Sequence, residues 1–181
     1  MNDTLTISPT EHVTVRTSTA ELLELEATYL PSRHRPPKHW HPSQDEHFEV
    51  LEGSVEVRVD GVQRTLAAGE RIDIPSGAVH QFGNPGPAPA RVRWQIRPGG
   101  RTEHWFRGID TLHRQGRVGR DGTPSILAFA VLLAEYRDVF RLSTPAAPVV
   151  RAVLAALAVL GRLRGYRSTP APDRGADRPQ D

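Results

Sequence analysis

Three histidines and one glutamate have the residue types and the spacing of a metal site. His39 and His41 are separated by one residue, so in a strand their side chains share one face. Glu46 follows five residues after His41, and His80 comes just after a predicted turn at 75–77. Imidazole and carboxylate ligands together suit a borderline divalent cation such as Fe(II), Mn(II), Ni(II), Cu(II) or Zn(II). Four such ligands leave room on a five- or six-coordinate metal for water, substrate or dioxygen.

The amino-acid composition excludes several classes of protein. The chain has 181 residues, which corresponds to one domain or to one domain with an appendage. Cysteine is absent, which excludes disulfide frameworks, thiolate zinc sites and cysteine nucleophiles. The 23 basic and 21 acidic residues give a formal charge of +2, too balanced to indicate nucleic-acid binding. We therefore expect no nucleic-acid partner.

The distribution of apolar residues gives no sign of a membrane protein. The first residues lack the basic and apolar segments of a secretory leader. No apolar run reaches the roughly 18–20 residues that a membrane-spanning helix needs, and the longest candidate, 152–160, is much shorter. We expect a soluble, cytoplasmic protein without a membrane span.

Strands must fold back on one another if the four side chains are to meet. Alternation of apolar and polar residues predicts strands at 23–29, 48–50, 55–59, 62–66, 72–74, 80–82 and 92–96. Asp60-Gly61 is a strong signal for a tight hairpin turn. Short strands separated by glycine and proline predict an all-β sandwich or barrel, in which alternate side chains point inward.

The first group of residues resembles a motif of the cupin superfamily. That motif reads G-x5-H-x-H-x3–4-E-x6-G. This chain matches it at His39, His41, Glu46 and Gly53, and departs from it at the opening glycine, where Arg33 stands. The departure concerns the turn before the site and leaves the proposed ligands intact.

The second cupin motif, G-x5-P-x-G-x2-H-x3-N, is matched at every element. The matching residues are Gly69, Pro75, Gly77, His80 and Asn84. Two linked motifs with this many fixed positions are unlikely to arise by chance. The resemblance is close over residues 39–84 and extends over about 12–97 as a fold.

The resemblance implies both a fold and a ligand set. It implies a mainly β protein whose residues 12–97 form a cupin-type double-stranded β-helix, or jelly-roll barrel. It assigns His39, His41, Glu46 and His80 as ligands of a divalent metal. In the same pattern Asn84 is a structural residue at a strand end.

Residues 98–167 are predicted to form a helical C-terminal extension that the resemblance does not cover. A short helix is expected at 103–113. A helix at 124–142 has one apolar stripe, whereas a helix at 147–161 is apolar nearly all round and ends at Gly161. We expect the last two to form an α-helical hairpin that packs against the barrel or a dimer seam; the alternative is that the last helix rests on a membrane surface. The polar segment 168–181 is expected to be a disordered tail.

Side chains near the proposed ligands have weaker signals. His47, Glu49 and Glu52 have the parity of outward-facing residues. Gln44 and Asp45 lie in the loop between the ligands, where they either orient an imidazole or contact solvent. No general base is evident from the sequence, and no residue is assigned to an organic cofactor.

The cupin fold does not determine a reaction. An intact ligand set favours a metal-dependent enzyme acting on a small organic molecule, either an oxidoreductase of the dioxygenase type or an isomerase or cyclase. The alternatives are a non-catalytic module that binds or senses a small molecule, and an inert structural barrel. A homodimer is expected because open sheet edges commonly pair and twofold dimers are the commonest oligomers.

Overall fold

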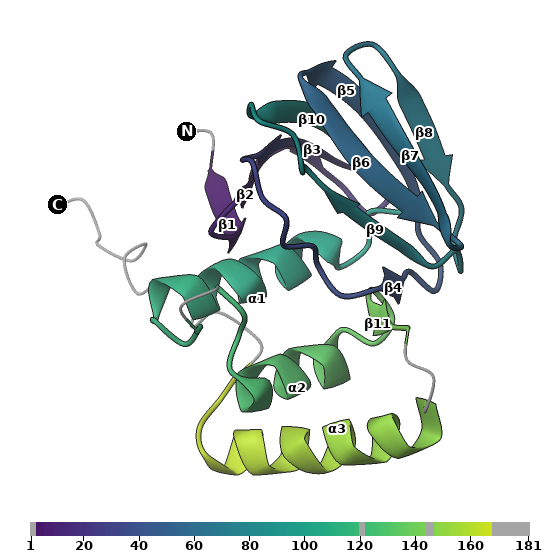
Figure 1. Cartoon of the computed structure of the whole chain (residues 1–181). Coiled ribbons are helices and arrows are strands. Elements are labelled where there is room, and N and C mark those ends of the chain that lie inside the picture. Colours follow the sequence, from purple (N-terminus) through teal and green to yellow (C-terminus); the bar gives the residue numbers. More distant parts are fainter. Residues whose placement is uncertain (1–2, 120–121, 144–146, 168–181) are drawn as a thin grey trace, which may run out of the picture.

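The strands of the computed structural model, which describes residues 3–119, 122–143 and 147–167, form two antiparallel sheets. The sheets face each other and enclose the core, as Figure 1 shows. This arrangement confirms the predicted mainly β barrel with a helical C-terminal part.

The first sheet has the strand order β1-β2-β3-β10-β5-β8. Its strands are β1 (Thr4–Ser8), β2 (Glu11–Ser18), β3 (Leu23–Tyr29), β5 (Asp45–Glu52), β8 (Arg71–Ile74) and β10 (Ala90–Arg97). The second sheet has the order β11-β4-β9-β6-β7. Its strands are β4 (His39–Trp40), β6 (Ser54–Val59), β7 (Val62–Ala67), β9 (His80–Gly83) and β11 (Arg141–Leu142).

Sequence alternation explains these strands well. In β3 every second side chain is buried and the others are half-buried, which is the pattern of one core-facing side. The hairpin between β6 and β7 turns at Asp60 and Gly61, whose φ angles are 47° and 88°. Both angles are positive, which is the conformation that a two-residue hairpin with an Asp-Gly turn adopts.

Aromatic rings fill the space between the two sheets. Phe48 of β5 stacks on Phe82 of β9 and on Trp94 of β10, with ring centroids 4.5 and 5.1 Å apart. These side chains come from both sheets, so their packing fixes the separation of the sheets. The ligand-bearing strands β4, β5 and β9 are positioned by this core.

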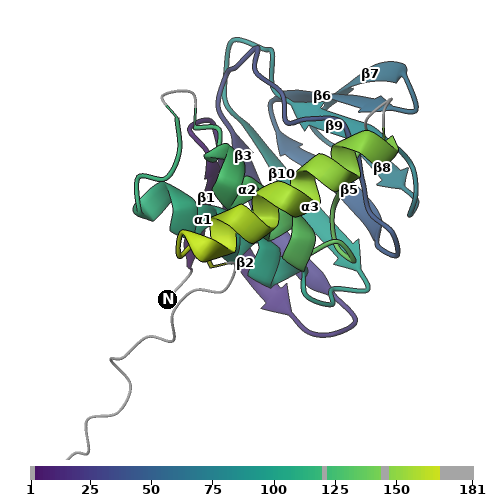
Figure 2. The same ribbon diagram turned by 90° about the horizontal axis from the view of Figure 1, so that it is seen from below.

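Three helices lie below the barrel as it is drawn in Figure 1: α1 (Thr102–Arg114), α2 (Ile126–Glu135) and α3 (Ala147–Leu163). The buried face of α1 includes Trp105, Phe106 and Ile109, which join the barrel core. α2 packs against α3, and Figure 2 shows α3 crossing over the side of α2 that faces away from the sheets.

The predicted helix at 124–142 is wrong in its second half. α2 ends at Glu135, and residues 141–142 instead form the short strand β11, which pairs with β4. The apolar spacing continues past Glu135 because Val139 and Phe140 are buried, but they pack against the barrel from a turn rather than from a helix. Tertiary contacts override helical periodicity here.

Within a single chain the last helix is buried on one face only, so its expected burial against a dimer partner stays a prediction. α3 packs one face on α2 through Ala158, which lies against Ala130 and Val131. Its other face is open: Val149 is 67% exposed and Leu163 is 80% exposed. The helix continues past Gly161 and is closed by Gly165 at a φ of 81°, where the Tyr166 N–H donates to the Gly161 carbonyl.

Among the described residues, no helix is both long and apolar enough to span a membrane. The expected tail at 168–181 lies outside the described residues.

Candidate metal centre

Three histidines from two strands and a loop converge inside the barrel. His39 lies in β4, His41 follows that strand, and His80 begins β9; the register of β4 and β9 places His39 opposite His80. Each ring offers one nitrogen, and these three nitrogens lie within 4.8 Å of one another. His41 and His80 are buried and His39 is half-buried, so the cluster is compatible with a divalent metal.

Main-chain carbonyls determine the tautomer of all three rings. His39 Nδ1 lies 2.9 Å from the Pro37 oxygen, His41 Nδ1 lies 2.6 Å from the Val139 oxygen, and His80 Nδ1 lies 3.0 Å from the Ala78 oxygen. A carbonyl oxygen only accepts hydrogen bonds, so each Nδ1 must carry the proton. Nε2 of each ring is thereby left with its lone pair available to a metal.

Glu46 of β5 faces two of these rings across the barrel. Its Oε1 is 3.3 Å from His41 Nε2, and its Oε2 is 2.9 Å from His80 Nε2. Trp94 Nε1–H donates to Oε1 over 3.1 Å, which holds the carboxylate in place. His41 Nε2 and Glu46 Oε2 are nevertheless buried without a well-aligned hydrogen bond. Buried groups left in this state call for an additional partner, and a cation between them would supply it.

The electrostatics of the cluster favour a carboxylate beside neutral imidazole. Burial, together with the neighbouring His80 and His41, lowers the pKa of His39 to about 3. Burial alone would raise the pKa of Glu46, but the facing His41 and His80 outweigh it and lower that pKa to about 2. For His80, burial opposes protonation, yet the adjacent Glu46 raises its pKa overall. Near neutral pH the site therefore offers one negative charge and an uncharged His39.

The helical extension completes the surroundings of the site. Phe140 stacks on His39, with ring centroids 4.5 Å apart and an interplanar angle of 19°. On its other side Phe140 stacks on Trp105, with a centroid separation of 4.6 Å. β11 pairs with β4, the strand that carries His39. The ligand-bearing strand is therefore held by the barrel on one side and by the extension on the other.

Comparison with known families decides what kind of barrel this is. The Cupin_2 family, described as a cupin domain, matches residues 25–96, which include all four predicted ligands. This barrel is a cupin domain. The predicted resemblance is therefore confirmed.

Curated relatives of the cupin domain come from Streptomyces. The tetracenomycin polyketide synthase protein TcmJ of Streptomyces glaucescens is 39% identical over 61 residues, which make up 34% of this chain and 41% of that protein. Polyketide synthase CurC of Streptomyces cyaneus is 36% identical over 61 residues, 34% of this chain and 40% of that protein. The chain thus spans about two fifths of the length of these relatives.

Solved structures with similar folds were also found. An RmlC-like cupin from Shewanella frigidimarina has a TM-score of 0.49 and 20% identity, covering 54% of this chain and 85% of its own. KdgF from a Halomonas species has a TM-score of 0.47 and 19% identity, covering 52% of this chain and 86% of its own.

Two residues of the second cupin motif donate hydrogen bonds to main-chain carbonyls of other segments. The Gly77 N–H donates to the His41 carbonyl over 2.9 Å, which ties the motif-two turn to a motif-one ligand. The Asn84 amide donates to the carbonyls of Tyr29 and Ala88 over 2.9 and 2.8 Å. Asn84 therefore closes a strand end, as expected of a structural residue.

The neighbours of the predicted ligands take different positions. Gln44 is buried, and its Oε1 lacks a hydrogen-bond partner among the described residues. Asp45 accepts a hydrogen bond from the Ser76 N–H and lies at the surface. His47 Nδ1 lies 2.6 Å from Asp73 Oδ1, outside the histidine cluster. The predicted outward orientation of His47 is therefore correct. Gln44 is thus the loop residue buried near the ligands, whereas Asp45 orders a turn.

Three features of the site's surroundings could not be predicted from the sequence patterns. Val139 acts through its carbonyl, which no side-chain pattern reveals, and Phe140 lies within the predicted helix at 124–142, where nothing in the sequence indicates a contact with His39. A cavity beside the cluster was also missed. It is lined in part by Glu11 and Tyr29, which precede the first motif and have no motif spacing.

Proposed function

We propose that the cupin domain binds one divalent metal through His39, His41, Glu46 and His80. The observation that carries this proposal is the pair of buried atoms His41 Nε2 and Glu46 Oε2, which lack a well-aligned hydrogen bond among the described residues, within a cluster whose Nδ1 atoms are all bound to carbonyls. A divalent metal held there would supply Lewis acidity for an isomerase or cyclase or, if redox-active, a reaction with dioxygen.

The protein's own residues prepare this site. Carbonyl partners keep the imidazoles in one tautomer and one orientation, so little reorganisation is needed on binding. Glu46 neutralises part of a cation's charge, and the Trp94 indole holds its carboxylate. Burial of His41, Glu46 and His80 keeps bulk water out, which strengthens every electrostatic interaction inside.

The reaction we propose is metal-dependent conversion of a small, polyketide-derived organic molecule. Two relatives over the cupin segment are named as polyketide synthase proteins. An enol or phenol oxygen of such a molecule is a ligand that a divalent metal can coordinate. An enzyme of the dioxygenase type and one of the isomerase or cyclase type both fit the ligand set. A binding or sensing module remains the alternative when no turnover occurs.

One experiment separates these functions. Metal-loaded protein is incubated with a panel of enolisable and phenolic compounds while dioxygen uptake and product mass are followed. Dioxygen uptake with a gain of oxygen mass would indicate a dioxygenase, whereas a product of unchanged mass or one lighter by water would indicate an isomerase or cyclase. A His80→Ala variant is the control that should lose turnover. Binding without any turnover across the panel would favour the non-catalytic alternative.

We also propose a homodimer. β7 ends the second sheet, and its outward Val62 is 67% exposed, so this edge offers main-chain groups and apolar surface to a second copy. Solution scattering at micromolar concentration should give twice the chain's mass of 20.0 kDa. A monomer mass would contradict the proposal.

A further inference from the structure

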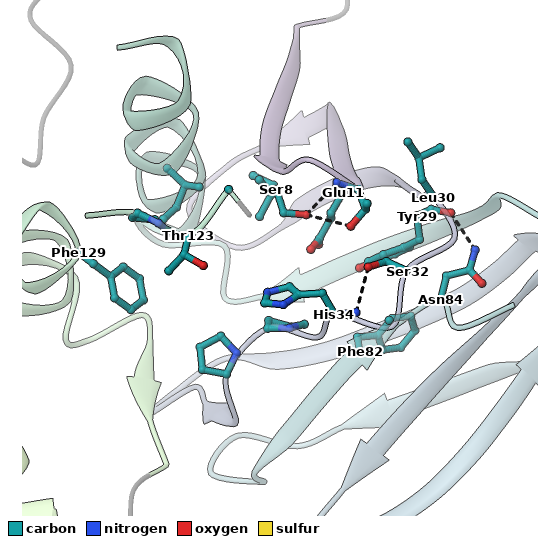
Figure 3. Close-up of a pocket in the computed structure, with 18 of the residues that line it drawn as sticks. Ser8, Glu11, Tyr29, Leu30, Ser32, His34, Phe82, Asn84, Thr123 and Phe129 are labelled. Atoms are coloured by element: carbon teal, nitrogen blue, oxygen red, sulfur yellow. Dashed lines mark hydrogen bonds between the residues drawn. The ribbon is translucent and has the colours of Figure 1, made fainter. Parts of the chain in front are cut away.

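A separate cavity lies between the barrel and the helical extension. Its volume is about 180 Å³, and strands β1, β2, β3 and β9 and helices α1 and α2 contribute to its wall. Figure 3 shows Phe82 of β9 and Phe129 of α2 on opposite sides, with Glu11 and His34 between them. None of the three clustered histidines lines it. The cavity adjoins the cluster through Phe140, which lines the cavity and stacks on His39.

The wall of this cavity is suited to a flat aromatic molecule. Trp105, Phe129 and Phe140 supply aromatic surface, and apolar groups predominate over polar ones in the lining. A cavity of about 150 Å³ lined by apolar side chains accommodates benzene. The volume here therefore admits a compound of about one or two fused rings.

Three polar side chains of the wall, those of Ser8, Ser32 and Asn84, already bind the protein's own main chain. The Asn84 amide binds the carbonyls of Tyr29 and Ala88. Ser32 Oγ accepts from the His34 N–H, and Ser8 Oγ accepts from the Thr10 N–H. These groups shape the cavity, and the Asn84 amide has no hydrogen left to donate to a ligand.

Glu11 is different, because its carboxylate lies in the cavity wall and no cationic side chain of the described residues is among the groups that shift its pKa. Among the described residues its hydrogen-bonding partner is the Tyr29 hydroxyl. Burial outweighs the opposing hydrogen bond from Tyr29 and raises the pKa of Glu11 to about 7. A carboxyl group in such a setting gains from a hydroxyl donor that enters the cavity.

We propose that this cavity binds a planar aromatic compound carrying a hydroxyl group, which donates a hydrogen bond to Glu11. The aromatic wall selects the ring, and Glu11 selects the hydroxyl. Because no clustered histidine lines the cavity, this binding does not depend on a metal, and its failure or success is independent of the metal assignment.

A pair of probes that differ only in the hydroxyl tests the proposal. The full chain is titrated with 2-naphthol and with naphthalene, followed by fluorescence, in the presence of a chelator and again after loading with a divalent metal. We expect saturable binding of one 2-naphthol per chain in both conditions, and a preference for 2-naphthol over naphthalene of about tenfold or more. Absence of saturable 2-naphthol binding would overturn the proposal.

Substitutions in the cavity wall test whether Glu11 is the source of the preference for 2-naphthol over naphthalene. Glu11→Met keeps the size of the side chain and removes its oxygens, so the preference should fall to within about twofold. If that variant fails to fold by circular dichroism, Glu11→Gln replaces a charged acceptor by a neutral one and should reduce the preference at least about threefold. Tyr29→Phe should keep the preference because Glu11 remains, and Glu52→Met at the barrel surface is the matched control. An unchanged preference in the folded Glu11 variant would refute the assignment.

Discussion

The imidazole of His41 donates a hydrogen bond from Nδ1 to the carbonyl of Val139 over 2.6 Å, across 98 residues of sequence. His41 belongs to the cupin motif, whereas Val139 belongs to the helical extension. The extension therefore helps to set the orientation of a predicted metal ligand and is more than a cover on the barrel. Phe140, the next residue, adds a stacking contact with His39.

Replacing Phe140 should weaken both the fold and the site. The ring is 8% exposed and stacks between His39 and Trp105, so Phe140→Ala should cost about 3–5 kcal/mol of unfolding free energy. Phe140→Leu should cost less because it fills more of the space. Denaturant unfolding in a chelator measures the stability, and a metal titration of both variants should show weaker binding for the alanine. Equal metal affinity in the alanine variant and the wild type would show that the extension does not position the ligands.

Removal of a ligand should remove the metal. His41→Ala and His80→Ala each delete one of four proposed ligands, and elemental analysis after dialysis should find most of the bound metal gone. His47→Ala is the matched control, since His47 contacts Asp73 outside the cluster. Full metal content in both ligand variants would contradict the assignment.

Trp94 should act on the metal through Glu46. Trp94→Phe keeps an aromatic ring in the core but removes the N–H that binds Glu46 Oε1. Loss of such an outer partner typically lowers metal affinity about 10–100-fold. Competition with a chelator measures this affinity. An unchanged value would mean that packing alone orients the carboxylate.

Acid should destabilise the metal-free protein through His39 and Glu46. The pKa of His39 is about 3 in the folded protein against an ordinary 6.5, so between these values the unfolded chain binds a proton that the native state does not. Stability therefore falls as pH falls through this window. The pKa of Glu46 is lowered from 4.5 to about 2, so protonation of Glu46 also lowers the stability as the pH falls between these values. His80, with its raised pKa, has the opposite sign and contributes stability below about 6.5 that is lost at higher pH.

Thermal melts in a chelator between pH 7 and pH 4 test this expectation. His39→Gln should show a shallower loss of Tm on acidification than the wild type, because it removes a group that must stay unprotonated. His104→Gln, at an exposed position, should follow the wild type. Parallel curves for His39→Gln and wild type would rule out His39 as a source of the pH dependence.

Gly161 should resist a substitution that normally favours helices. An alanine Cβ there would lie 2.8 Å from Val131 Cγ2 and 2.9 Å from the Leu127 oxygen of α2. In an open helix alanine is about 1 kcal/mol better than glycine. Here the collision should reverse the sign, and Gly161→Ala should cost about 1–3 kcal/mol in denaturant unfolding. Ala152→Gly, on the exposed side of α3, serves as a control with a cost of about 1 kcal/mol. A higher Tm for Gly161→Ala would contradict the close packing of α2 and α3.

The barrel was predictable because its signals are local. Alternation in 23–29 and 92–96 predicts β3 and β10, and Asp60-Gly61 predicts the β6–β7 hairpin. Motif spacing predicted which four side chains would approach one another, and they do. Strand period and turn chemistry depend on neighbouring residues, so a sequence carries them directly.

Only the tertiary structure decided how the extension meets the barrel. The apolar spacing of 124–142 is equally consistent with one long helix, but packing of Val139 and Phe140 against the barrel ends α2 at Glu135 and forms β11. The Val139 carbonyl has no sequence signature as a partner of His41, because every residue has a carbonyl. The Glu11 cavity likewise depends on which strands and helices are adjacent. These features arise from contacts between distant segments, whose geometry follows from the packing of the whole chain.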